Sequence, residues 1–265
     1  MISVLTVNFR SAADLALLAE SIREHAGGLD VELIVANHSP DEPLTLPADR
    51  SPSVTVLPST NHGFAAGVNL AFRQARGEII MIANPDLRIT EETLPRAVEY
   101  LDGHPQVGIV LPLLRHPSGE VQDSVRRFYT WATVLYARSP LRWLGMRPAF
   151  FRRYLYEDLD RAAPTPVDWG LGAAMFLRRA DCDADGVFDE RFFLYFEDVD
   201  LCLRMWRRGR TVMYCPHIEC LHAHRRSSRN PLSLSGWWHW RSLCRFIAKH
   251  HGLPQRPGKG GSGGG

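Results

Sequence analysis

Short apolar runs rich in β-branched residues alternate, along the first third of the chain, with segments whose apolar residues recur at helical spacing. The strand-like runs cover residues 2–7, 31–35, 54–57 and 78–83, and the helical segments cover 14–25 and 64–76. The second helical segment ends at Gly77, a residue type that commonly terminates helices. This alternation predicts an α/β fold, with a Rossmann-like, mostly parallel sheet and flanking helices.

Sheets of this kind bind ligands in the loops that follow the carboxyl ends of their strands. The loop after the fourth predicted strand reads Asn84-Pro85-Asp86. Pro85 cannot extend the strand, so Asp86 should be presented on a turn at the edge of the sheet. A carboxylate there could hold Mg²⁺ or Mn²⁺ against a diphosphate. The alternative is a turn in which the polar side chain only stabilises its own backbone.

Glycines and small residues open the helical segment at 61–69, which reads NHGFAAGVN. Free amide groups and close backbone approach would suit a phosphate or a sugar. The spacing matches neither of the common phosphate-loop patterns. A helix start that packs tightly on the sheet is an equally good explanation.

The acidic run around Asp198 carries the strongest indication of chemistry. Aromatic residues at 192–196 precede Glu197, Asp198 and Asp200, and His222 follows later in the chain. Carboxylates in apolar surroundings are costly unless a cation, hydrogen bonds or a chemical role compensates. The competing explanation is a helix N-terminus, where solvated acidic residues are common.

The chain has 265 residues, of which 45% are hydrophobic, and its formal net charge is +2. It is long enough for one catalytic unit, which we predict at residues 1–228, with a helical insertion at about 124–163 on the acceptor side. An amphipathic helical extension is expected at 229–257 and a flexible linker at 258–265. The small net charge argues against a dedicated nucleic-acid binder.

Basic and aromatic residues are concentrated in two segments, 126–153 and 237–246. Seven arginines and no acidic residue occur between Ser124 and Tyr156. Such helices suit the headgroup region of an anionic membrane, although they could equally pack on the catalytic unit with solvated arginines. No apolar stretch is long enough to span a membrane, no signal peptide opens the chain, and the five cysteines contain no C-x-x-C pair. A cytoplasmic protein, peripheral to the cytoplasmic face of the inner membrane at most, is expected.

Several ordered motifs together resemble the family 2 glycosyltransferases, and within them the rhamnosyltransferase-like branch. They are residues 61–69, Asn84-Pro85-Asp86, Val167-Asp168-Trp169 with Gly172-Ala173, Phe188-Asp189-Glu190, and residues 196–202. The likeness extends from Ile2 to about Gly252. It implies a GT-A fold and an inverting transfer of a sugar from a nucleotide-sugar donor to a hydroxyl of a glycan or lipid-linked saccharide, as in surface polysaccharide synthesis.

The same resemblance implies roles for individual residues. Asp198 stands at the position of the catalytic base, Asp86 at the last position of the metal-binding D-x-D motif, and His222 where a further metal or diphosphate ligand often stands. The metal would be Mg²⁺ or Mn²⁺. Donor contacts are expected from Val7, Asn8, Asn37, Asn61, Gly63, Phe64, Gly67, Asn69, Asn84, Asp86, Trp169, Gly172 and Glu197.

The chemistry of inversion is consistent with these roles, because it needs one base near the acceptor oxygen and positive charge near the departing diphosphate. We expect the negative charges of Glu197 and Asp200 to raise the pKa of Asp198. Two positions depart from the family pattern. Asn84 replaces the first aspartate of D-x-D, and Ala36 replaces an aspartate before Asn37. Asn37 could serve the base of the nucleotide through its donor and its acceptor.

Alternatives remain at this stage. L-rhamnose from dTDP-rhamnose is the preferred donor, with UDP-hexose or GDP-mannose as alternatives, and a non-catalytic glycan- or lipid-binding module is the alternative from another class. A nucleotidyltransferase would need a basic glycine loop near the start, which residues 7–10 do not supply. A zinc site from Cys215, His217, Cys220, His222 and His224 would not match the usual ligand spacing, because this segment alternates like a strand.

Overall fold

The structure, a computed structural model, describes residues 1–47, 52–139, 141, 145–223 and 234–257. It contains a mixed sheet in which the strands follow the order β3-β2-β1-β4-β10-β6-β11-β5, with β8 added beside β11. The strands are β1 (Ile2–Asn8), β2 (Val31–Asn37), β3 (Ser53–Pro58), β4 (Ile79–Ala83), β5 (Leu87–Ile89), β6 (Val107–Arg115), β8 (Thr165–Pro166), β10 (Ala174–Arg178) and β11 (Thr211–His222). The helices are α1 (Ala12–His25), α2 (Phe64–Gln74), α3 (Thr93–Gly103), α4 (Trp131–Arg138), α5 (Ala149–Tyr154), α6 (Glu197–Arg207) and α7 (Leu234–His250).

The predicted α/β fold with a mostly parallel sheet is confirmed. Strands β1 to β4 pair in parallel, as do β6 and β11, whereas β10 runs antiparallel between β4 and β6. The short strands β5 and β8 are also antiparallel to β11. Because β10 reverses direction, the start of β10 lies beside the carboxyl end of β4, and this junction becomes the centre of the candidate site.

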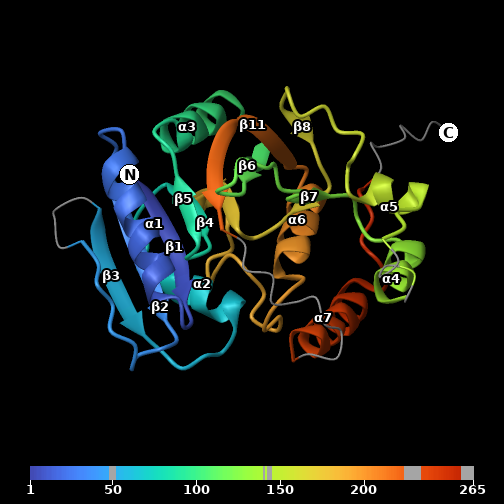
Figure 1. Ribbon diagram of the computed structural model, residues 1–265, viewed down its shortest axis with the longest axis horizontal. Helices are drawn as coiled ribbons and strands as arrows, with labels where there is room; N and C mark the ends of the chain where they lie inside the picture. The colour runs from blue at the N-terminus through green and yellow to red at the C-terminus, as the bar shows by residue number, and fades with distance from the viewer. Residues whose placement is uncertain (48–51, 140, 142–144, 224–233, 258–265) are drawn as a thin grey trace.

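Side chains that alternate along the central strands fill two apolar layers, one on each face of the sheet. Val4 of β1 packs in the layer that contains α1 and α3, and Leu5 packs in the layer that contains α2 and α6. This is the period-two alternation expected of a sheet covered on both faces. Helices α4, α5 and α7 lie at the end of the molecule opposite β3 (Figure 1).

Helix α2 approaches the sheet so closely that its glycines cannot be replaced without displacing neighbours. A Cβ on Gly67 would lie 2.7 Å from Val7 Cγ2, and a Cβ on Gly63 would lie 2.3 Å from the backbone oxygen of Phe193. Gly63 also has φ 101, a conformation that favours glycine. The packing explanation for these glycines is therefore correct, and it fixes the start of α2 beside the 188–196 segment.

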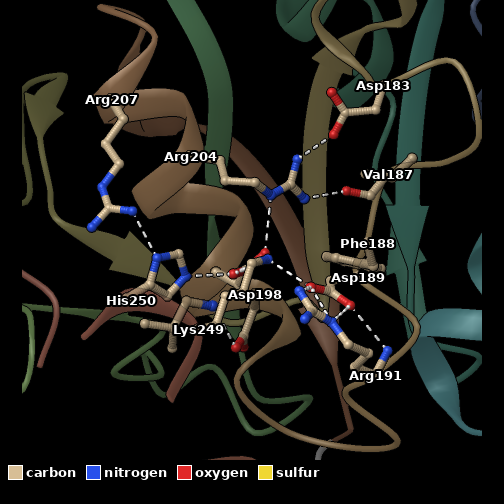
Figure 2. Close-up of polar contacts among 12 residues, drawn as sticks. Asp183, Val187, Phe188, Asp189, Arg191, Asp198, Arg204, Arg207, Lys249 and His250 are labelled. Atoms are coloured by element: carbon tan, nitrogen blue, oxygen red, sulfur yellow. Dashed lines mark hydrogen bonds and ion pairs between the residues drawn. The ribbon is translucent and has the colours of Figure 1, made fainter. Parts of the chain in front are cut away.

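Helix α7 is joined to α6 by a buried cluster of charges. The Asp200 carboxylate, on α6, is fully buried. It contacts Arg204 Nε at 2.9 Å, Lys249 Nζ at 2.6 Å and His250 Nε2 at 2.7 Å. Lys249 also lies 2.7 Å from Asp189 Oδ2, and Figure 2 shows Arg204, Lys249 and His250 together with Asp189. Although burial acts to raise it, the pKa of Asp200 is held below its ordinary value by these cations.

Aromatic contacts extend this attachment to the segment before α6. Phe193 stacks on Trp238 with ring centroids 4.1 Å apart, Phe196 packs on Phe246, and Ser242 donates a hydrogen bond of 2.8 Å to the Leu194 carbonyl. The predicted helical extension thus packs on the catalytic unit. Its predicted boundary between residues 228 and 229, and the predicted linker at 258–265, lie outside the described residues.

The predicted insertion at about 124–163 contains α4, α5 and the strand β7 (Val125–Arg126). Strand β7 pairs with β9 (Trp169–Gly170), forming a small second sheet beside the main one. Among the described residues, no helix has the length and apolarity required to cross a membrane.

Replacing Asp200 tests whether the buried charges hold α7 in place. Asp200→Asn leaves Arg204 and Lys249 desolvated without their shared counter-ion, so the free energy of unfolding should fall by about 3–5 kcal/mol. Urea unfolding measures it. The control Glu92→Gln removes an exposed ion pair with Arg96 and should change stability little. Equal stability of the two variants would contradict a structural role for the cluster.

Candidate active site

Two neighbouring residues, Gly172 and Ala173, connect the loop of Asp86 to the helix of Asp198. The amide of Asn84 donates a 2.9 Å hydrogen bond to the Ala173 carbonyl. The amide of Gly172 donates a 3.2 Å hydrogen bond to Asp198 Oδ2. The loop after β4 and the start of α6 are therefore attached to the same point of the chain, directly before β10.

His222, at the end of β11, lies beside Asp86, with 3.3 Å between His222 Nε2 and Asp86 Oδ1. Pairing of β11 with β5 and a hydrogen bond from the Ala223 amide to the Asp86 carbonyl fix this arrangement. Gln122 Oε1 lies 2.8 Å from His222 Nδ1, and Gln122 Nε2 donates to the His222 carbonyl at 2.6 Å. With this orientation of the Gln122 amide, Nδ1 carries the proton and the Nε2 lone pair is directed to the Asp86 side.

This pair fits a divalent cation. In the neutral imidazole with Nδ1 protonated, Nε2 and Asp86 Oδ1 are two acceptors 3.3 Å apart, so a cation between them would stabilise both. Within the described part of the chain, no group of three or more histidine, cysteine or acidic side chains is arranged to hold a metal. Two protein ligands are nevertheless typical of sites at which a nucleotide phosphate completes the coordination.

Asn84 stands where the family pattern has its first aspartate. Its Nδ2 lies 3.5 Å from His222 Nε2, and its carbonyl accepts a hydrogen bond from the Leu87 amide, which closes the turn. Asn84 thus lies next to the Asp86–His222 pair without contributing a negative charge. The cation would be held with less negative charge than in a D-x-D site.

Asp198 lies in the first turn of α6, and its carboxylate is partly exposed. Its Oδ1 accepts a 2.8 Å hydrogen bond from the Val199 amide. This side chain is therefore bound at a helix N-terminus, as the alternative interpretation of the acidic run predicted. The two residues before the helix, Tyr195 and Phe196, both have positive φ, 67 and 69. Bulky residues rarely adopt this conformation, and such strain is common at functional sites.

Burial raises the pKa of Asp198 to about 6. Burial and, next, the adjacent Asp198 charge raise the pKa of Glu197 well above its ordinary value, and Glu197 Oε2 has no hydrogen-bond partner in the described structure. Glu197 therefore keeps its proton while Asp198 ionises. The expected rise in the pKa of Asp198 is present, but its main cause is burial rather than the negative neighbours, and Arg204 and Lys249 offset the charge of Asp200.

A cluster of aromatic rings lies near Asp198. Tyr129 stacks on Trp169 and on Phe196, with ring centroids 5.6 and 5.2 Å apart. The indole nitrogen of Trp169 donates to the Arg127 carbonyl, and the indole is buried. The Asp198 charge acts on Tyr129, so this ring cluster is close to the carboxylate whose pKa burial raises.

The asparagines predicted to bind the donor are largely engaged within the protein. Asn8 Nδ2 donates to Asn37 Oδ1 at 2.9 Å, and Asn8 Oδ1 accepts from Ser11. Asn37 Oδ1 also accepts from the Ser39 amide, so Asn37 can offer a nucleotide base its amide hydrogens but not its carbonyl oxygen. The expectation that Asn37 supplies both a donor and an acceptor is thereby corrected.

The residues at the start of α2 have internal partners as well. Asn61 accepts from the Gly63 amide, and Phe64 donates its amide to the Phe193 carbonyl at 2.8 Å. The Asn69 side chain is buried, donates to the Phe188 carbonyl and accepts from the amides of residues 187 and 188. Because its hydrogen-bonding groups hold the 187–190 segment, the Asn69 side chain has a structural role rather than a contact with the donor.

Sequence reasoning missed Gln122 and did not single out Arg126. Gln122 acts on His222, which is 100 residues away, so no local pattern indicates it. Arg126 belongs to the basic segment noticed in the sequence, but only the pairing of β7 with β9 brings it next to Trp169 and the base.

The cysteines and histidines considered as zinc ligands are dispersed. Cys215 and Cys220 are buried in the apolar layer around α1 and α3, and His217 packs on Tyr100 with ring centroids 5.5 Å apart. His222 instead faces Asp86, and His224 lies outside the described residues. All five cysteines are free thiols.

The family model for glycosyl transferase family 2 matches residues 3–191. The chain belongs to this family. It is 30% identical, over 83% of its length and 75% of the relative's, to the N-acetylglucosaminyl-diphospho-decaprenol L-rhamnosyltransferase of Mycobacterium tuberculosis. It is 28% identical to the rhamnosyltransferase WbbL of Escherichia coli K12, over 74% of each chain. The resemblance to the rhamnosyltransferase-like branch of the family 2 glycosyltransferases is thus confirmed.

Among solved structures, the glycosyltransferase is similar to a mannosyltransferase from Pyrobaculum calidifontis in complex with GDP-Man and Mn²⁺. The TM-score is 0.56 at 18% identity, and the match covers 98% of this chain and 65% of the mannosyltransferase. This chain therefore spans just under two thirds of that protein's length. The likeness confirms the GT-A fold.

The pH dependence of sugar transfer tests the role of Asp198. If Asp198 is the base it must be ionised, and because burial raises its pKa to about 6, kcat/KM should fall as the pH drops through about 6. Asp198→Asn should lower kcat by about 10²- to 10⁴-fold while donor binding persists. Glu197→Gln imitates the protonated glutamic acid, so the fall of kcat/KM at low pH, the acidic limb of the profile, should stay near pH 6. An unchanged rate in Asp198→Asn would contradict the assignment.

Proposed function

We propose that the chain is an inverting, metal-assisted glycosyltransferase that moves L-rhamnose from dTDP-rhamnose to a hydroxyl group of a lipid-linked saccharide. The observation that carries the mechanism is the attachment of the Asp86 loop and of Asp198 to the same residues, Gly172 and Ala173. The names of the two rhamnosyltransferase relatives support the sugar. The acceptor named for the mycobacterial relative supports a lipid-linked diphosphate acceptor.

In the proposed reaction the Asp198 carboxylate removes the proton of the acceptor hydroxyl as its oxygen attacks the anomeric carbon. The bond from that carbon to the diphosphate breaks, and one displacement inverts the configuration. Asp86 and His222 would hold Mg²⁺ or Mn²⁺, which supplies positive charge to the leaving diphosphate. Glu197, neutral beside the base, keeps a second negative charge away from the attacking oxygen.

Donor recognition would use the carboxyl edge of the sheet. Asn37 offers its amide hydrogens to the nucleotide base, and Asn84 lies beside the cation pair. This edge would be shaped mainly by the packing of Val7, Asn8, Gly63, Phe64 and Gly67. Trp169 and Gly172 would hold the catalytic base, Asp198. A UDP-hexose or GDP-mannose donor is the alternative within the same reaction.

Donor hydrolysis and transfer over a panel of nucleoside diphosphate sugars, with and without Mn²⁺, test the proposal. We expect dTDP-rhamnose to be used best, with activity lost under chelator and restored by Mn²⁺ or Mg²⁺. Asp86→Ala should reduce activity at least about 100-fold and weaken Mn²⁺ binding. The matched variant Asp102→Ala, which removes an exposed carboxylate of α3, should leave both unchanged. Full activity in chelator would contradict metal assistance, and binding of a glycan without turnover of any donor would favour a binding module.

We further propose that the outward faces of α7 and α4 rest on the cytoplasmic face of an anionic membrane. Trp237 and Trp240 are 54% and 51% exposed, and Arg241, Cys244 and Ala248 continue the same outward stripe of α7. On α4, Trp131 and Leu135 are 59% and 69% exposed. An outward stripe of tryptophans with arginine is suited to the headgroup region of anionic lipids, where a lipid-linked acceptor would lie.

Co-sedimentation with vesicles of anionic and of neutral lipids tests this contact. The double variant Trp237→Ser, Trp240→Ser should bind anionic vesicles at least about ten-fold more weakly than the wild type. Added salt should weaken the binding of the wild-type protein to these vesicles. Leu17→Ser removes an exposed apolar side chain from α1 and is the matched control. Equal vesicle binding by all three proteins would contradict a lipid contact through α7.

A further inference from the structure

Arg126 is a half-buried cation without a carboxylate partner. Among the described residues, Arg126 takes part in no ion pair, and its side chain makes one hydrogen bond, from Nη1 to the carbonyl of Val125 at 2.8 Å. Its neighbour in sequence, Arg127, is by contrast paired with Asp158 and donates to the Arg153 carbonyl. The Asp198 charge is near enough to interact with this guanidinium, but no described carboxylate is in contact with it, so a partly buried cation keeps hydrogen-bond donors for an anion.

The position of Arg126 is set by the small sheet. Strand β7 pairs with β9, so that Arg126 is opposite Trp169, and the Leu171 amide donates to the Ser124 carbonyl. The next residue, Gly172, holds Asp198 through its amide. Arg126 is thus attached to the strand that supports the base, and its positive charge acts on Asp198, favouring the ionised carboxylate.

The same segment also reaches the candidate metal pair. Gln122, four residues before Arg126, holds His222 through both of its amide groups. Residues 122–126 therefore run from the Asp86–His222 pair to the surroundings of Asp198. An anion bound to Arg126 would lie near Asp198. The donor diphosphate would instead bind the cation held by Asp86 and His222.

We propose that Arg126 binds the diphosphate of the acceptor and so positions the acceptor hydroxyl on Asp198. This inference rests on the proposed function. An arginine fork binds phosphate oxygens through two parallel hydrogen bonds, which orients the ligand as well as attracting it. In a saccharide linked to a lipid through a diphosphate, the diphosphate lies one sugar ring away from the hydroxyls, which matches an arginine near the base.

Transfer to two synthetic acceptors that carry the same sugar, one as an alkyl diphosphate and one as a simple alkyl glycoside, tests the proposal. Arg126→Gln should raise KM for the diphosphate acceptor about 10- to 100-fold and leave KM for the glycoside within about two-fold. Arg126→Lys should recover part of the affinity. Arg152→Gln, which removes an exposed arginine of α5, is the matched control and should behave as the wild type.

Equilibrium binding separates this proposal from the proposed reaction, because it needs no sugar transfer. A short-chain prenyl diphosphate should bind the wild-type protein and the Arg152 variant, and should bind Arg126→Gln about ten-fold more weakly or worse. The affinity for dTDP with Mn²⁺ should not change. Loss of dTDP affinity with unchanged prenyl diphosphate binding would overturn the assignment in favour of the donor, and equal KM changes for both acceptors would reduce Arg126 to a structural role.

The pH at which the rate falls on the acidic side of the profile provides a third test of the proposal. Removing the cation near Asp198 should move the limb from about pH 6 to a higher pH in Arg126→Gln, and Arg126→Lys should restore it. A limb that stays in place would contradict the proximity of the guanidinium to the base.

Discussion

The candidate site depends on two backbone hydrogen bonds made by consecutive residues. Gly172 donates to the carboxylate of Asp198, and Ala173 accepts from the amide of Asn84. These residues immediately precede β10, which enters the sheet antiparallel next to β4. If β10 ran in the parallel direction, its start would lie at the opposite edge of the sheet, and the metal pair could not meet the base.

Desolvation then gives the two acidic residues different tasks. Glu197 and Asp198 are adjacent and desolvated near Tyr129, where two negative charges would be costly. Asp198 has two backbone amide donors and the nearby charge of Arg126, which together favour its ionised form over that of Glu197. The proton therefore stays on Glu197, and Asp198 is the carboxylate that is ionised at neutral pH, as the proposed base must be.

The C-terminal helix α7 packs against α6 and against the turn that precedes it. Asp200, two residues from the base, is fully buried and bonded to Lys249 and His250 of α7. The strained turn at Tyr195 and Phe196 is covered by rings of the same helix, including His239. Helix α7 thus stabilises the turn that presents Asp198 while its outer tryptophans stay exposed, so the proposed lipid contact and the base share one helix.

Local periodicity was sufficient to predict the first four strands, helices α1 and α2, and the continuation of α6 after the acidic run. It could not indicate that β10 inserts between β4 and β6, because that pairing joins segments far apart in the sequence. The motifs located Asp86, His222 and Asp198, and the structure brings the first two together. The contact of Gln122 with His222, the pairing of Arg126 with Trp169 and the neutralisation of Asp200 depend on long-range contacts and had no local signal.

The central claim is that the metal pair and the base serve one substrate bound between them. A crystal grown with Mn²⁺ and dTDP, examined by anomalous scattering of the manganese, tests it most directly. The account predicts a single manganese peak in coordination contact with Asp86 and His222, with the terminal phosphate of dTDP bound to it on the side that faces Asp198. Manganese bound elsewhere, or a diphosphate directed away from Asp198, would contradict it.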